Sequence, residues 1–268
     1  MPDPTPSRSA LPARSRVRKA ILVSILASLA LSVGCAKPYD PFQVPRDDVR
    51  AQVRTVAISP YTAPHSQMDA ERARATFEPL VTERLEAAGL TVVPSEVWLG
   101  IHRQAAEDLG GIYDPSTGEG DEEKLELLNE TLYAELANQH DVDALLFLQV
   151  KQVRLDLKRA ELDFCGKSGR VNFPKREDGT GFSARGTLTG TGVGTVTLAY
   201  ASCLSAMLFD MDRNFLYGIQ HGLEVFDSYA RQTRAKRPRE ERLKDPAVIE
   251  EAVETVVGPL ADGYAGEE

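Results

Sequence analysis

The strongest constraint on the fold is a run of seven residues near the middle of the chain, 144–150, in which only Gln149 is polar. Successive side chains of a strand point to opposite sides of a sheet, so a strand that is apolar at every position has to be covered on both faces. This pattern is typical of a central strand enclosed between two layers of helices. We therefore expect a three-layer domain built around residues 144–150.

The segments before this strand alternate between two patterns. Short β-branched runs at 55–59 and 90–93 predict strands, and each is followed by apolar positions at helical spacing. Pro79 lies within the first helical pattern, so we expect that helix either to begin near Thr76 or to kink at the proline. Ser95 is expected to cap the helix that follows the second strand. A third helical stripe precedes the central run.

After the central strand the pattern changes to an alternation of apolar and polar residues, which predicts half-exposed antiparallel strands at 153–157, 195–209 and 215–219. A final helix is expected after Asp245. Strands separated by helices, then a meander, then a closing helix predict an α/β fold. It has three layers and a mixed sheet, parallel in its first half and antiparallel in its second, with helices on both faces. We expect a single domain over residues 53–268, with a loop insertion at 159–190.

The amino terminus has the layout of a secretory signal. Basic residues up to Lys19 precede an apolar run at 20–31, and a small residue and a cysteine, Gly34 and Cys35, follow closely. The run is too short to cross a membrane, since a spanning helix needs about 20 apolar residues. An uncleaved anchor is the alternative.

Gly34-Cys35 resembles the lipobox of bacterial lipoproteins, with one departure, because the Leu usual three residues before the cysteine is Ser32 here. The resemblance implies that residues 1–34 are a signal peptide and that Cys35 carries acyl chains, palmitate among them, which hold the protein to a membrane. It also implies a location facing the periplasm, and at the outer membrane because Ala36 is not Asp. Residues 35–52 contain prolines and lack periodicity, so we expect a tether.

Cys165 and Cys203 remain once Cys35 is assigned to lipidation. In an oxidising periplasm paired cysteines commonly form bridges, and a bridge between these two would contribute about 4 kcal/mol in the chain-entropy model. The alternative is two separate thiols, with Cys203 a small apolar residue in a strand. The spacing excludes a Cys-x-x-Cys motif.

Charge and motifs exclude several functions. The chain carries a net charge of −9, and the first 34 residues hold five basic side chains against one acidic, which leaves −13 for the rest. Such an acidic domain is a poor ligand for nucleic acid. The glycine-rich stretch 189–194 lacks the lysine of a phosphate loop, and 210–214 has the pattern of a turn rather than a calcium loop. We predict no cofactor and no metal, since the histidines are scattered: His65, His102, His140 and His221.

The order of elements resembles a group of envelope proteins. The residues that carry this resemblance are the Val-Ala-Ile-Ser-Pro strand at 56–60, the Thr-Val-Val-Pro strand at 91–94, the Asp-Ala-Leu-Leu strand at 143–146 and the hairpin at 209–217. They are similar to the fold shared by the TolB amino-terminal domain, the curli-secretion lipoprotein and lipoprotein activators of penicillin-binding proteins. These are patterns of hydrophobicity, and fold alone does not carry function.

Our hypothesis is a non-enzymatic, lipid-anchored envelope protein that binds or scaffolds another envelope protein. One alternative is a periplasmic hydrolase or cell-wall-active enzyme with a site built from the loops at 110–120 or 159–190. Another is a subunit of an oligomeric envelope or secretion complex. The basic segment 231–239 is either a partner surface or a solvated loop.

Overall fold

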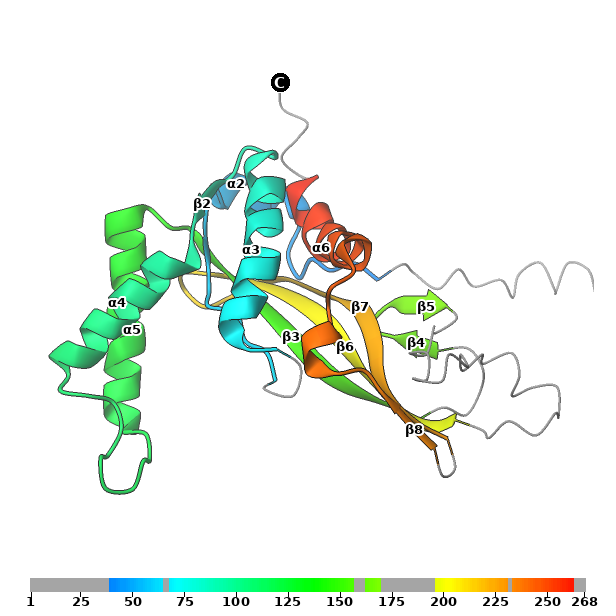
Figure 1. Cartoon of the computed structure of the whole chain (residues 1–268). Coiled ribbons are helices and arrows are strands. Elements are labelled where there is room, and N and C mark those ends of the chain that lie inside the picture. The colour runs from blue at the N-terminus through cyan, green and yellow to red at the C-terminus, as the bar shows by residue number, and fades with distance from the viewer. Residues whose placement is uncertain (1–38, 65–67, 157–161, 170–195, 231–232, 263–268) are drawn as a thin grey trace, which may run out of the picture. The chain divides into compact units, whose positions relative to one another are not determined.

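The computed structural model describes residues 39–64, 68–156, 162–169, 196–230 and 233–262 (Figure 1). Residues from Pro41 onward belong to one compact unit, whose centre is a six-stranded sheet. A separate two-stranded hairpin accompanies this sheet.

The six-stranded sheet is mixed, with the strand order β2-β1-β3-β6-β7-β8. β1 pairs in parallel with β2 and with β3, and the other neighbours pair antiparallel. The predicted fold class, parallel in the first half and antiparallel in the second, is therefore confirmed. The strands are β1 (Thr55–Ile58), β2 (Thr91–Val93), β3 (Ala144–Asp156), β6 (Val196–Asp210), β7 (Phe215–Ala230) and β8 (Thr233–Lys236).

The longer helices α3, α5 and α6 begin where the sequence supplies an aspartate as cap. Asp69, Asp121 and Asp245 each accept a hydrogen bond from a backbone N–H in the first turn of the helix that follows. Within the described residues, no helix combines the length and the apolarity needed to span a membrane. The helices are α2 (Arg46–Gln52), α3 (Ala70–Glu86), α4 (Ser95–Asp108), α5 (Glu122–His140), the short 3₁₀ helix η2 (Arg239–Glu241) and α6 (Pro246–Ala261).

Helices α3 and α6 cover one face of the sheet (Figure 1). Phe77 of α3 and Val256 of α6 are fully buried in one cluster with Leu146 of β3 and Leu204 of β6. Tyr217 of β7 is also buried there, and its hydroxyl donates a hydrogen bond to the carbonyl of Val256 at 2.9 Å. This face holds the larger part of the hydrophobic core.

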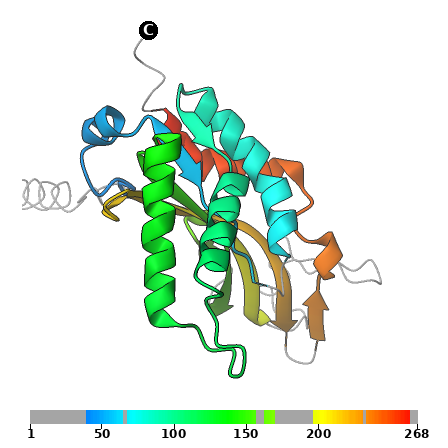
Figure 2. The same cartoon turned by 90° about the vertical axis from the view of Figure 1, so that its left-hand side faces the viewer.

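Helices α4 and α5 cover the opposite face, but only over the parallel half of the sheet (Figure 2). Leu132 and Leu136 of α5 and Ile101 of α4 pack against Ala57 of β1 and Leu145 of β3. The first part of β3 therefore has helices on both sides, which explains why its sequence is apolar at both alternating positions.

The face of α4 and α5 continues past these helices onto β6 and β7. Leu145 pairs with Phe209 and Lys151 pairs with Cys203, so the odd-numbered residues of β6 share the face of Leu145. The patterns predicted as strands at 144–150 and 153–157 belong to one long strand, because β6 pairs with β3 along its whole length.

The structure excludes two local predictions about the helices, a start of the first helix near Thr76 and Ser95 as the cap of the second. Helix α3 begins well before Thr76 and continues through Pro79, whose ring lies on the exposed side, where water can reach the carbonyl that the proline leaves without a donor. Ser95 does not cap α4 but is its first residue, and it is buried. The backbone N–H and hydroxyl of Ser95 donate to the carboxylate of Glu78 at 2.9 and 2.7 Å, so a residue of α3 satisfies the start of α4.

The structure also corrects the predicted tether at 35–52. Residues 46–52 form helix α2, and Val49 on this helix is buried in the main core. Just before it, the ring of Phe42 lies 4.9 Å from the ring of Tyr217. The folded unit therefore starts about a dozen residues earlier than expected, because this segment packs against β7, far away in the sequence.

Candidate functional site

The predicted insertion contains a small hairpin, of which the structure describes β4 (Leu162–Phe164) and β5 (Lys167–Gly169). The two strands are joined by Cys165 and Gly166, which both have positive φ, 52° and 76°. A two-residue hairpin turn needs this backbone at both positions, and it is normally occupied by Asn, Asp or Gly. A cysteine at the first position is unusual, which indicates that its side chain has a specific contact.

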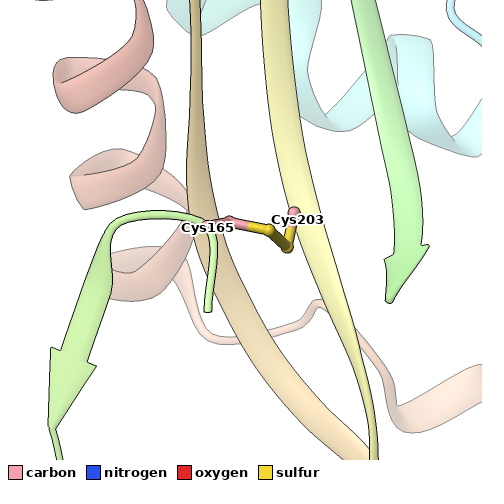
Figure 3. Close-up of a disulfide and its surroundings, with 2 residues drawn as sticks. All are labelled: Cys165 and Cys203. Carbon is pink, nitrogen blue, oxygen red and sulfur yellow. A yellow bond between two sulfur atoms is a disulfide. The ribbon is translucent and has the colours of Figure 1, made fainter. Parts of the chain in front are cut away.

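Cys165 forms a disulfide with Cys203, with the two Cα atoms 6.3 Å apart (Figure 3). The bond joins the tip of the hairpin to β6 (Figure 3). Cys203 is fully buried, in a cluster with Ala201 and Val225. Of the two alternatives drawn from the sequence, the bridge is therefore present in the structure and the separate thiols are not.

The hairpin packs against small residues of β6 and β7. Gly222 of β7 pairs with Cys203, and a Cβ atom on Gly222 would lie only 2.6 Å from the ring of Phe164 and 2.8 Å from its carbonyl oxygen. Phe164 in turn joins the apolar cluster of Ala201 and Val225. Glycine in a strand often marks a close approach of another segment, and this was the one sequence signal of the contact.

A charged cluster lies beside this contact, and sequence reasoning missed it. The Nζ atom of Lys167 lies 2.6 Å from Oε2 of Glu251 on α6. His221 of β7 is buried, and its Nε2 atom lies 3.6 Å from Oε1 of the same glutamate, too far for a hydrogen bond. Burial, and then the charge of Lys167, lower the pKa of His221, while Glu251 opposes this shift. Its surroundings therefore favour the neutral imidazole.

A second feature is an open groove of about 600 Å³ beside α3 and the start of α4. Pro79 and Pro94 form part of its lining, and the exposed carboxylates of Glu83 and Glu86 stand along it. The groove is acidic overall, with a single guanidinium, that of Arg74, among its lining residues.

Two of the groove's four carboxylates are already engaged. Glu78 accepts hydrogen bonds from Ser95, and Oε1 of Glu96 lies 2.7 Å from Nη1 of Arg74. No ion pair among the described residues involves Glu83 or Glu86, so their charge is available to a ligand. The groove's lining includes neither histidine nor cysteine, and its chemistry suits attraction of a cationic group rather than nucleophilic attack.

The two loops proposed as an enzyme site do not meet in the part of the chain that the structure describes. The loop at 110–120 joins α4 to α5, whereas the described hairpin of the 159–190 insertion lies against β6 and β7 (Figure 1). In the first loop, the carboxylate of Asp114 accepts hydrogen bonds from the backbone N–H groups of Ser116 and Thr117, which is a turn stabilised within itself.

The basic segment is largely tied into the structure where it is described. Arg237 pairs with Glu224, and burial raises the pKa of this carboxyl while Arg237 opposes the shift. Arg242 is buried, with its guanidinium 4.1 Å from the ring centre of Phe226. Arg239 lies 3.7 Å from Asp69.

The lipidation site, the turn at 210–214 and metal binding were also considered in the sequence. Of these, Cys35 lies outside the described residues. Asp210–Asn214 forms a turn, since Asp210 accepts a hydrogen bond from the backbone N–H of Asn214 at 2.7 Å. Over the described residues, no group of three or more His, Cys, Asp or Glu side chains is placed to hold a metal ion.

Comparison with known proteins yields distant structural likenesses alone. No protein family matches the chain, and no curated protein matches it in sequence. A PelC dodecamer from Paraburkholderia phytofirmans is similar at 11% identity, covering 78% of this chain and 89% of that chain, with a TM-score of 0.33. A neuraminyllactose-binding hemagglutinin homolog from Helicobacter pylori is similar at 8% identity, covering 84% and 87%, with a TM-score of 0.34. These values are too low to carry an argument about function, and the resemblance to the TolB group stays a prediction.

Proposed function

We propose that this protein is exported and lipid-anchored through Cys35, and that its domain binds another envelope component without catalysing a reaction. The observation that carries the proposal is the Cys165–Cys203 disulfide. Disulfides form and persist in oxidising compartments, and the amino-terminal segment independently has the pattern of an export signal. Two unrelated parts of the chain thus support the same compartment.

The groove beside α3 supports the binding part of the proposal. Its lining combines apolar surface from Pro79 and Pro94 with the carboxylates of Glu83 and Glu86. Complementary charge speeds association and selects the partner's sign of charge. We therefore propose a partner segment that presents Lys or Arg side chains to this groove.

The compartment is tested by measuring the intact mass of the protein extracted from membranes, with and without reductant, beside a Cys35→Ala variant. The expected species begins at Cys35, carries acyl mass and gains two hydrogen atoms on reduction. Cys35→Ala is expected to lack the acyl mass. An unmodified chain that keeps residues 1–34 would contradict the lipoprotein proposal.

The binding surface is tested by crosslinking in intact cells. We expect the Glu83→Lys, Glu86→Lys double variant to lose a dominant crosslinked partner, because both free carboxylates of the groove are reversed. The Glu126→Lys, Glu130→Lys double variant, at two exposed positions of α5, is the control matched in net charge. Equal loss in both variants would show that overall charge, and not the groove, governs the contact.

A further inference from the structure

The hairpin β4–β5 is a separate piece of structure fastened to the sheet by side chains. It forms a two-stranded sheet of its own, and no backbone hydrogen bond joins its described residues to those of the six-stranded sheet. An isolated two-stranded hairpin is marginally stable at best, and these strands have three residues each. The position of the hairpin therefore depends on its attachments: the disulfide, the ring of Phe164 and the ion pair of Lys167.

These three attachments differ in strength. The side chains of Lys167 and Glu251 are 26% and 52% exposed, and exposed ion pairs contribute little to stability. Phe164 is buried in a small cluster that consists mainly of alanine, cysteine and valine, so it contacts fewer large side chains than a residue of the main core. The disulfide is the covalent attachment, and it holds the turn at the point where the hairpin is closest to β6 and β7.

The hairpin also reaches a buried histidine on the other face of β7 through the side chain of Lys167. His221 precedes Gly222 in β7, so its side chain points to the other face of the sheet, toward α6, and its side chain is about nine-tenths buried there. Its Nε2 atom is buried without a hydrogen-bond partner among the described residues, and it faces Glu251, to which Lys167 of the hairpin is bound. Departure of the hairpin would remove the charge of Lys167 from this cluster.

We propose that the Cys165–Cys203 disulfide is a redox clasp, whose reduction by a dithiol frees hairpin β4–β5, uncovers the sheet face around Gly222 and separates Lys167 from Glu251. This inference goes beyond the proposed function and does not depend on the lipid anchor or on the groove. It assigns a conformational role to a bond that otherwise only stabilises the fold.

Reduction proceeds by thiol–disulfide exchange in two steps. A thiolate of the dithiol attacks Sγ of Cys165, which is partly exposed, and the bond between the two sulfur atoms breaks. Cys203, which is fully buried, leaves as a thiolate and takes up a proton. The second thiol of the reductant then displaces Cys165 from the mixed disulfide. Two electrons and two protons pass to the protein, and the dithiol becomes a disulfide.

The test uses the folded protein before and after reduction with dithiothreitol. NMR of the His221 imidazole should show a titration midpoint that moves upward on reduction, because the charge of the nearby Lys167 helps to lower its pKa in the oxidised form. Hydrogen exchange should become at least tenfold faster at 162–169 and along 219–225, while α5 keeps its protection. The Cys165→Ser, Cys203→Ser variant should match the reduced protein and should not respond to dithiol.

Two outcomes overturn the proposal. The titration midpoint of His221 and the hydrogen-exchange rates at 162–169 could both stay unchanged after complete reduction. The disulfide would then only stabilise the fold, and the hairpin would remain bound to the sheet without it. If α5 loses protection together with the hairpin, reduction unfolds the whole domain and no clasp exists. A Lys167→Gln variant kept oxidised separates the two causes, since it removes the charge beside His221 while the hairpin stays fastened.

Discussion

One face of the sheet is covered in two different ways along its width. Over β1 and the first part of β3, helices α4 and α5 supply large side chains such as Ile101 and Leu132. Over β6 and β7, the same face is covered by a hairpin that supplies Phe164 and a covalent bond from Cys165. The first covering is held by buried apolar area, whereas the second has little such area and relies on the disulfide.

The difference shows how a domain can close a sheet face without a helix. Small residues in β6 and β7, namely Ala201, Cys203 and Gly222, let the hairpin backbone lie close to the strands. The contact then buries fewer methyl and methylene groups than a helix would, so it gives less hydrophobic free energy. Changes in the two regions should therefore differ in size and even in sign.

The largest effect is expected from Leu132→Ala under the helical covering. Leu132 is fully buried, and removing its side chain should lower the free energy of unfolding by about 2–5 kcal/mol, through lost burial and the cavity left behind. Phe164→Ala in the hairpin should cost less than about 3 kcal/mol, the lower limit for Phe→Ala in a packed core. Urea denaturation measures both. An equal or larger loss for Phe164→Ala would break the comparison.

Gly222→Ala should have the next largest effect. The added Cβ atom would lie 2.8 Å from the carbonyl oxygen of Phe164. This is a steric clash with a backbone atom, which cannot move aside as the end of a flexible side chain can. We expect a loss of about 1–3 kcal/mol, as for overpacked sites, and faster hydrogen exchange at 162–169. Unchanged stability would mean that the hairpin is seated less closely than the structure shows.

Gly100→Ala in helix α4 is the matched substitution in the other region, and it should have the opposite sign. Nothing lies within 4 Å of a Cβ atom at Gly100, which is exposed within the helix. Alanine is better than glycine inside a helix by about 0.5–1 kcal/mol, so the free energy of unfolding should rise by that amount. A loss measured by the same denaturation would indicate that α4 is packed against something at this position.

The smallest effect concerns pH and belongs to the hairpin region. The pKa of His221 is lower in the folded protein than in the unfolded chain, so the unfolded chain binds the proton more readily. The contribution of His221 to the free energy of unfolding is thus fully present above the ordinary histidine pKa. It is lost as the pH falls through the lowered pKa of the folded protein. Denaturation at a series of pH values from about 7.5 to 5 should show this decline in the wild type and less of it in His221→Gln. The same slope in both would assign the decline to other groups.

Local patterns in the sequence were sufficient for the architecture. The apolar run of β3 predicted helices on both faces, and Asp245 predicted the start of α6, because burial on two faces and helix capping leave their marks within a few residues. The alternation that begins at residue 195 likewise predicted the meander of β6 and β7.

What the sequence by itself determined is therefore the order and type of the elements from β1 to β3, the antiparallel strands that follow and the closing helix α6, together with a pair of cysteines able to bridge. Only the tertiary structure decided that Cys165 meets Cys203, that Glu78 satisfies the start of α4, and that α2 joins the core. Each of these contacts joins residues from different elements, so no periodicity within one segment records it. The proximity of His221 to Glu251 belongs to the same class, since it arises where α6 packs over β7.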